Sequence, residues 1–340
     1  MVRAAGRACR HRPDAAARVA RFILASALPD GGFRDRSGAS DLYYTVFALQ
    51  ALCALRGDQE SLRGGSPDLP RADPIAALTR GGPGEPPREG SGFEPAIARS
   101  AGSRRAEAGG DILSAAERYL RSFADGAALD FVHTCCLARC WALLATGGPE
   151  EPVRQAILAS LENWRSSDGG YHATAGAAAG TAYANFLALG AYEDFDALVP
   201  EPAGLVVSLA GLTSADGGYA NAPGAIHGST SATAAALMTL NELGQPVDRR
   251  AATWLLAQHC PEGGFRAMPA APVPDLLSTA TALHALARAG AALEDVRGPC
   301  REFVEGLWDP DGGFRGHWAD DEADCEYTFY GLLALGHLVI

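Results

Sequence analysis

The chain has 340 residues, of which 48% are hydrophobic, and a formal net charge of −12. The length and apolar content are enough for a sizeable core, while the acidic balance argues against nucleic acid or an anionic membrane as a partner. The sequence contains no lysine, which excludes Schiff-base catalysis by lysine and a Walker-type phosphate site.

The start of the chain and the cysteines indicate the cellular compartment. No run approaches the ~20 apolar residues of a membrane-spanning helix, and the Arg-bearing residues 1–12 are not followed by a signal-peptide core. Eight cysteines lie in apolar stretches without a CxxC pair, so we expect reduced core thiols. These features predict a cytoplasmic protein.

A short element organises the chain: an acidic residue, one or two glycines and usually an aromatic residue. The first glycines of successive copies are separated by 95, 43, 48, 46 and 49 positions. Such periods mark helical or propeller repeats, and the long first interval indicates one insertion. The six copies begin at Asp30, Asp125, Asp168, Asp216, Glu262 and Asp311.

The segments before these elements are amphipathic. Residues 15–27, 153–165 and 249–259 carry charges on one face and apolar side chains on the other. We expect them to be outer helices of the repeats.

A second signature, about ten residues after each element, predicts a helix start. Asp41, Asp130 and Asp324 are each followed three and four places later by Tyr or His and by Thr. A side chain of this kind accepts hydrogen bonds from the exposed N–H groups of a first helical turn. The Asp position is filled in the other copies by Asp275, Gly180 and Ser229.

The helices that begin here are rich in Ala and Leu and apolar on nearly every side, which is typical of buried, inner helices. They are expected near residues 42–56, 131–146, 181–190, 230–243, 276–289 and 325–338. Residues 57–111 differ, being rich in Gly, Pro, Arg, Ser and Glu. This composition predicts a flexible insertion between the first two repeats.

Six hairpins of one outer and one inner helix bury their apolar faces by closing into a ring or by stacking as an open solenoid. Closure is favoured because the chain ends on an apolar run, residues 331–340, and not on a polar capping repeat. We therefore expect an all-α fold: one (α/α)6 barrel, or toroid, spanning residues 1–340 around a central apolar cavity. The polar helix starts would gather at one mouth.

These repeats resemble those shared by protein prenyltransferase β subunits and squalene-type cyclases. The resemblance rests on Gly-Gly-Phe, a spacer with Arg and Gly, Asp-x-x-Tyr/His-Thr and an Ala-Leu helix, over roughly residues 14–56 and 112–340. For the transferases it implies a zinc ion, held by Asp, Cys and His, that activates an acceptor thiolate. It also implies a prenyl diphosphate held by polar residues at the mouth.

Carried over by position, the transferase site falls on the first two repeats. Arg36 and Tyr44 match the family's diphosphate-binding Arg and Tyr, while Asp41 and His133 match two of the zinc ligands. Tyr43 stands where the family has its cysteine ligand. The resemblance thus leaves zinc with two of the three protein ligands that such sites usually have.

The last repeat resembles the cyclases instead. Asp324, Glu326 and Tyr327 lie in the register of the cyclases' Asp-x-Asp-Asp-Thr motif, with Glu326 at the position of the proton donor. A carboxylic acid in an apolar cavity has a raised pKa, as protonation of an alkene requires. Helix capping remains the alternative role for these residues.

Further ligand candidates are His227 and the aromatic residues near the inner-helix starts. His227 lies in a segment that resembles the transferases' His-Gly-Gly diphosphate segment. The aromatic residues either line an isoprenoid pocket, where their faces would also stabilise carbocations, or fill the core. They are Tyr43, Tyr44, Phe47, Phe131, Trp141, Tyr183, Phe186, Tyr327, Phe329 and Tyr330.

The leading hypothesis from the sequence is a prenyltransferase-like enzyme that binds an isoprenoid diphosphate and transfers the prenyl group to an acceptor such as a peptide or protein. A non-catalytic lipid- or peptide-binding toroid and a class II terpene cyclase remain open. The catalytic candidates are Asp41, Tyr44, His133, Asp324 and Glu326, with zinc on Asp41 and His133. The substrate-binding candidates are Arg36, Tyr43, Tyr183, His227 and Tyr327.

Overall fold

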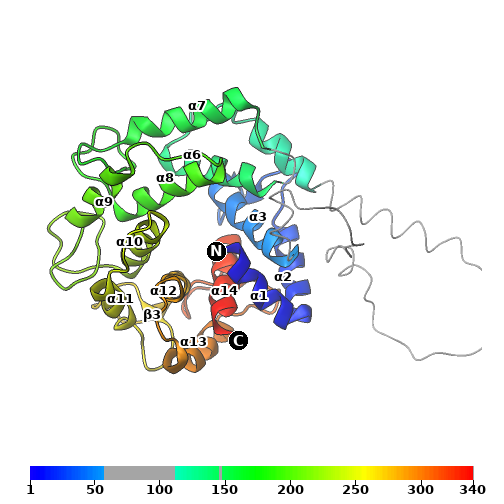
Figure 1. Cartoon of the computed structure of the whole chain (residues 1–340). Helices are drawn as coiled ribbons and strands as arrows, with labels where there is room; N and C mark the ends of the chain where they lie inside the picture. Colours follow the sequence, from blue (N-terminus) through cyan, green and yellow to red (C-terminus); the bar gives the residue numbers. More distant parts are fainter. Residues whose placement is uncertain (57–111, 145–147, 340) are drawn as a thin grey trace, which may run out of the picture.

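The computed structural model describes residues 1–56, 112–144 and 148–339, so the expected insertion, residues 57–111, lies outside the described residues. Within them, apolar helices form the inner wall of a closed ring (Figure 1). Each inner helix packs against the next, and the last packs against the first, which closes the ring as predicted. They are α3 (Leu42–Arg56), α6 (Phe131–Leu143), α8 (Ala182–Asp194), α10 (Thr230–Glu242), α12 (Leu276–Arg288) and α14 (Cys325–Leu338).

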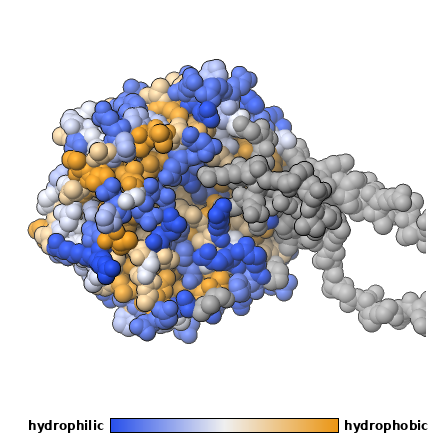
Figure 2. All heavy atoms as spheres, viewed as in Figure 1, coloured by the Kyte–Doolittle hydropathy of each residue, from blue (hydrophilic) through white to orange (hydrophobic). Residues whose placement is uncertain are grey.

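A second layer of helices surrounds this wall. In Figure 2, hydrophilic residues cover much of the periphery, as expected for outer helices that are amphipathic. The layer comprises α2 (Pro13–Ala25), the helix over residues 112–121, α7 (Glu151–Leu161) with the 3-10 turn η1 (Glu162–Trp164), α9 (Pro202–Gly211), α11 (Arg249–Leu256) and α13 (Glu294–Gly306).

The glycine turns lock neighbouring repeats together. Gly169, whose φ is 90°, approaches α9 so closely that a Cβ atom would lie 2.8 Å from the Cα atom of Gly204. Gly312, with φ 106°, makes the equivalent approach to the backbone of Arg18 in α2. Only glycine tolerates both the left-handed conformation and the contact. The turn of the last repeat thereby docks on the outer helix of the first.

The predicted helix starts are confirmed. A side-chain oxygen at each start accepts a hydrogen bond from the backbone N–H three residues later. In the third repeat the cap is Thr181 and not Gly180, because glycine has no side-chain acceptor. The capping residues are Asp41, Asp130, Thr181, Ser229, Asp275 and Asp324.

The threonine of the signature joins the glycine turn to the inner helix. The Thr328 hydroxyl accepts from the backbone N–H of Phe314 at 3.1 Å, and that of Thr233 accepts from Tyr219 at 2.9 Å. Both threonines are fully buried. This hydrogen bond satisfies a backbone donor inside the core, which explains why Thr recurs at this position.

Short antiparallel ribbons connect some outer and inner helices, a detail that the sequence analysis did not predict. They are β1 (Phe33–Arg34) with β2 (Ser40–Asp41), β3 (Phe265–Arg266) with β4 (Pro274–Asp275), and β5 (Phe314–Arg315) with β6 (Ala323–Asp324). Each ribbon ends at a capping Asp, so it holds that residue at the mouth of the ring.

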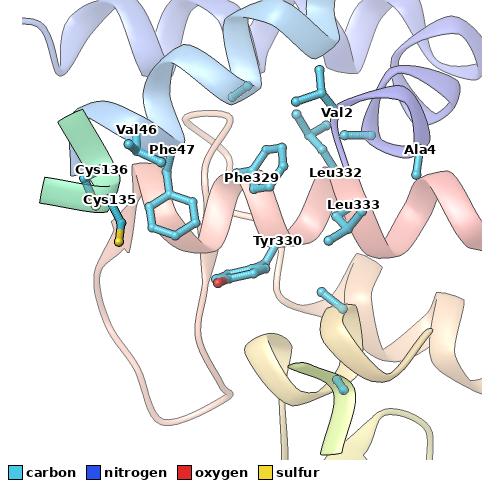
Figure 3. Close-up of a cluster of buried hydrophobic side chains, with 14 of the residues drawn as sticks. Val2, Ala4, Val46, Phe47, Cys135, Cys136, Phe329, Tyr330, Leu332 and Leu333 are labelled. Atoms are coloured by element: carbon cyan, nitrogen blue, oxygen red, sulfur yellow. The ribbon is translucent and has the colours of Figure 1, made fainter. Parts of the chain in front are cut away.

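An unpredicted helix, α1 (Val2–His11), packs against α3 and α14. Figure 3 shows Val2 and Ala4 beside Leu332 and Leu333 of α14. The Arg7 Nε atom donates to the Gly336 carbonyl at 2.7 Å, near the C-terminal end of α14. Helix α1 therefore lies toward the end of the ring opposite the Asp-bearing helix starts.

Two sequence expectations concern the protein as a whole. None of the helices in the described ranges is long and apolar enough to cross a membrane. All eight cysteines are free; seven are buried and Cys53 is half-buried. The expected placement of the cysteines in the core is confirmed for these seven.

Candidate active site

An aromatic cavity lies inside the ring. One chamber of about 320 Å³ continues into a smaller one of about 90 Å³, and Tyr43, Tyr183, Phe186 and Tyr330 line both. In Figure 3, Phe47 and Tyr330 project from α3 and α14 toward the space that Cys135 faces from α6. This is the apolar cavity expected from the sequence.

The expected aromatic residues divide between cavity and core. Phe47 and Phe329 also line the smaller chamber. Phe131 and Trp141 are buried in the wall instead, where Phe131 packs edge-on against Trp164. Both of the alternatives left open by the sequence are thus realised, by different residues.

A larger groove of about 920 Å³ lies outside the ring, between α1, α2, α13 and α14. Its lining includes Cys9, Glu305 and Trp308, and none of the candidate catalytic or binding residues. The chemistry therefore has to be sought in the inner cavity.

The second residue after each helix cap occupies an equivalent place on its inner helix. At this position Tyr43, Tyr183, Ser231 and Leu277 line the larger chamber. Repeat geometry directs the equivalent Glu326 of α14 toward the same space. Its carboxylate accepts a 2.7 Å hydrogen bond from the Tyr43 hydroxyl, so it lies directly beside a residue of the cavity wall.

Glu326 combines burial with an acidic side chain. Burial raises its pKa to about 7, the hydrogen bond from Tyr43 lowers the pKa, and the nearby charge of Asp324 raises it. A carboxyl group with this pKa is substantially protonated at neutral pH. It can therefore act as a proton donor at the wall of an apolar chamber.

Asp324 forms an ion-pair cluster above Glu326. Its Oδ2 atom lies 2.7 Å from Arg36 Nε, and Asp320 Oδ2 lies 2.8 Å from Arg36 Nη2. Burial raises the pKa of Asp324, while the hydrogen bond with Arg36 opposes that shift. The guanidinium also lies over the Tyr327 ring, 5.4 Å from its centroid. Arg36, predicted to bind diphosphate, is thus held by two carboxylates.

Tyr44 and Asp320 complete the surroundings of this cluster. Burial, followed by the charges of Asp324 and Glu326, raises the pKa of Tyr44 to about 12. The sequence analysis missed Asp320, since it lies between β5 and β6 without any repeat signature. Only its contact with Arg36, 284 positions earlier in the chain, reveals its role.

Asp41 and His133 converge, as the proposed zinc site requires. His133 Nε2 lies 3.5 Å from Asp41 Oδ2, but His133 Nδ1 lies 2.9 Å from Asp130 Oδ2. Burial lowers the pKa of His133, yet the hydrogen bond and charge of Asp130 outweigh it and the net shift is upward. Carboxylates on both sides of the ring favour the imidazolium form, which cannot bind a metal.

The third zinc ligand has no candidate here. Tyr43 stands at the family's cysteine position and turns to Glu326, and the described ranges hold no group of three or more His, Cys, Asp or Glu suited to a metal ion. The side chains do not fit a zinc site. Zinc binding by Asp41 and His133 stays a prediction from the resemblance.

His227 lies apart from the other candidates. Its side chain is 64% exposed and its Nδ1 atom lies 3.3 Å from Asp216 Oδ2. No contact of the described residues connects it with Glu326 or Arg36. The structure therefore brings together Arg36, Tyr43, Tyr44, Asp324, Glu326 and Tyr327, places Tyr183 in the adjoining cavity wall, and leaves His227 outside.

Solved structures with the same fold include type II terpene cyclases. MstE from Scytonema, in variants bound to geranylgeranyl dihydroxybenzoate and to merosterolic acid A, gives TM-scores of 0.58 and 0.59 at 14% and 13% identity. In both comparisons 97% of each chain is covered. A protein from Actinoplanes gives a TM-score of 0.53 at 15% identity, covering 96% of this chain and 98% of the other. These likenesses show a shared fold.

Sequence comparison gives the family directly. No curated protein matches the chain. The sequence does match the prenyltransferase alpha-alpha toroid domain over residues 10–78, 121–258 and 230–338, which is well over half of the chain. The chain therefore belongs to the prenyltransferase alpha-alpha toroid family.

Proposed function

We propose that the protein is a class II terpene cyclase, in which Glu326 protonates an alkene of a polyprenyl substrate held in the aromatic cavity. One observation supports the proposal: a half-buried carboxyl group with a pKa of about 7 is hydrogen-bonded to the wall of an apolar chamber. Tyr43, the hydrogen-bond partner of that acid, itself lines the chamber.

The chemistry follows from this placement. The proton of the Glu326 carboxyl group adds to one carbon of the alkene, whose π electrons form the new C–H bond and leave a carbocation on the neighbouring carbon. Successive alkenes attack that cation and close rings, and loss of one proton to water restores an alkene. The product is an isomer of the substrate.

The surroundings support each stage. The Tyr43 hydroxyl donates to the Glu326 carboxylate that remains after proton transfer. Phe47, Tyr330 and Tyr183 line the chamber, where aromatic rings would stabilise a carbocation by cation–π attraction. The apolar wall excludes water, which would otherwise quench the cation early.

Prenyl transfer, the leading hypothesis from the sequence, has less support. Its diphosphate arginine, Arg36, is paired with Asp320 and Asp324, and the side chains around His133 do not fit zinc. The length of the chain is no objection to cyclisation, since MstE is a terpene cyclase of which 97% is covered by this single toroid. A purely binding toroid would have no use for a half-buried acid of raised pKa.

A reaction in D₂O tests the proposal. The purified protein is incubated with farnesylated and geranylgeranylated phenols, and the products are analysed by mass spectrometry and NMR. We expect cyclic isomers that carry one new C–D bond, because Glu326 is reloaded from solvent.

A parallel incubation with the corresponding prenyl diphosphates and a cysteine peptide tests prenyl transfer. Release of diphosphate with thioether formation, and no cyclic isomer in the first incubation, would refute the proposal. Recovery of unchanged substrate in both incubations would refute it as well.

A further inference from the structure

A chain of hydrogen bonds lies near the end of the cavity opposite Glu326. His284 of α12 lines the larger chamber and is 6% exposed. Its Nδ1 atom lies 2.9 Å from Nε2 of His337 in α14, and His337 Nδ1 lies 3.4 Å from Nη2 of Arg7 in α1. Three helices far apart in the sequence thus contribute one relay.

Arginine fixes the direction of this relay. A guanidinium only donates hydrogen bonds, so His337 Nδ1 accepts from Arg7 and the proton of neutral His337 is on Nε2. His337 Nε2–H then donates to His284 Nδ1, which places the proton of neutral His284 on Nε2. No side chain in the described part of the protein accepts from that N–H. The cavity wall therefore presents a hydrogen-bond donor.

The relay stays neutral across the working pH range. Burial, together with the nearby charges of the Met1 amino group, Arg288 and Arg7, lowers the pKa of His284 to about 2. Burial, with the charges of Arg7 and the Met1 amino group, lowers the pKa of His337 to about 4. Arg7 is held in place by its bond to the Gly336 carbonyl. Neither ring becomes charged near neutral pH, so the N–H of His284 keeps its direction.

The distance between the two ends suits an elongated ligand. Leu277, Thr281 and His284 line the chamber along one face of α12, and seven residues of helix place His284 about 10 Å from Leu277. On α14, Glu326 and His337 are 11 positions apart, or about 16 Å along the helix axis. The donor thus faces the cavity near one end, and the acid lies beside Tyr43 of the cavity wall near the other.

We propose that His284 binds an uncharged oxygen acceptor, such as a phenol or carbonyl, on the head group of the prenylated substrate. The prenyl tail then extends toward the mouth and presents its terminal alkene to Glu326. This inference rests on the proposed function and specifies its substrate class: a prenyl chain attached to an oxygen-bearing head, in contrast to a plain hydrocarbon or a prenyl diphosphate.

The charges near this end favour an uncharged head group. Arg139 is paired with Asp194, and Arg288 with Glu242. The amino group of Met1, which also lines the chamber, has its pKa lowered to about 6 by burial, so it carries little charge at neutral pH. Arg7 is committed to the Gly336 carbonyl and His337. A diphosphate would need several free cationic donors, whereas a single acceptor oxygen needs the one N–H that His284 offers.

Binding to a matched pair of ligands tests the inference. The full chain carrying Glu326→Gln, so that the ligand is not consumed, is titrated calorimetrically with a farnesylated phenol and with the farnesylated benzene that lacks only the oxygen. We expect the phenol to bind about tenfold more tightly, the upper end for one hydrogen bond. His284→Phe should abolish this preference, and His284→Gln, which keeps an N–H donor, should restore part of it.

Thr281→Val is the matched control on the same helix face. Its hydroxyl already donates to the Leu277 carbonyl at 2.8 Å, so the affinity ratio of the two ligands should not change. ¹⁵N NMR of histidine-labelled protein adds a second readout: His284 should be protonated on Nε2, and Arg7→Gln should disturb that tautomer.

The possible failures are distinguishable. Equal affinities of the two ligands, or a ratio that His284→Phe leaves unchanged, would overturn the role of His284 even if wild-type protein forms cyclic products. A clear preference for the phenol without any cyclic product would support the head-group site and refute the cyclase proposal. Absence of binding by both ligands would overturn both.

Discussion

Two parts of the inner wall, helices α8 and α10 on one side and helix α14 on the other, have the same structural role but different side chains at their starts. Helices α8 and α10 are capped by the neutral hydroxyls of Thr181 and Ser229, whereas α14 is capped by Asp324. Two residues farther on, α10 has Ser231 and α14 has Glu326. Helices α8 and α10, here called the neutral wall, show that neither capping nor ring packing requires a carboxylate at these two positions. The carboxylates of α14 are therefore better explained by a role in the proposed reaction.

The strongest test of this contrast is Glu326→Gln. We expect turnover to fall about 1,000-fold, the middle of the range for loss of a general acid, with little change in thermal stability, since the amide still accepts from Tyr43. The measurement is product formation alongside a thermal unfolding curve. More than a tenth of the wild-type rate in this variant would show that another group donates the proton.

The converse change on the neutral wall is Ser229→Ala. Loss of the cap should cost about 1 kcal/mol of stability while the cyclic product still forms.

Thr328→Val and Thr233→Val test whether the two walls share one scaffold. Each change leaves a buried backbone N–H, of Phe314 or of Tyr219, without its acceptor. Each should lower the free energy of unfolding by about 1–3 kcal/mol, measured by urea denaturation.

The control is Thr253→Val on the exposed face of α11, where the hydroxyl bonds only to its own helix. A change of less than about 0.5 kcal/mol is expected there. A large loss for one buried threonine and none for the other would break the equivalence of the walls.

The pH profile gives the smallest expected effect. The donor must be protonated, so the rate should fall as pH rises above about 7, the pKa to which burial raises Glu326, by about tenfold per pH unit. In Tyr43→Phe the hydrogen bond that lowers this pKa is lost, and the falling limb should move to higher pH.

Tyr219→Phe removes a hydroxyl bonded to Asp248, at the cap of the outer helix α11, and should leave the limb where it is. If the pH profile of Tyr43→Phe coincides with that of the wild type, the fall in rate above pH 7 is not due to deprotonation of Glu326.

The ring was predictable because its signals are local and repeated. Capping residues such as Asp130 and Asp275 mark the starts of inner helices in the sequence. Helices α10, α12 and α14 begin and end within one residue of the expected bounds. The positions of Glu326 and Tyr43 beside the mouth follow from the same register. Their hydrogen bond to each other does not, because it joins the first repeat to the last.

The missed features are those without a repeat. Helix α1 has no counterpart in the other repeats, so no periodicity indicated that it would lie against α3 and α14. The role of Asp320 could not be predicted for the same reason, because its ion pair with Arg36 forms only when the ring closes. The relay from Arg7 to His284 needs three helices in their final places, and a sequence read locally cannot supply that arrangement.

The docking of the Gly312 turn on α2 makes the boundary between last and first repeat equivalent to any other. A linear stack can fray from its ends, since a terminal unit has a neighbour on one side only. In this protein every repeat has two neighbours, and the unfolding of one repeat would expose the apolar faces of both neighbours to water. We therefore expect the described repeats to unfold together in one cooperative transition.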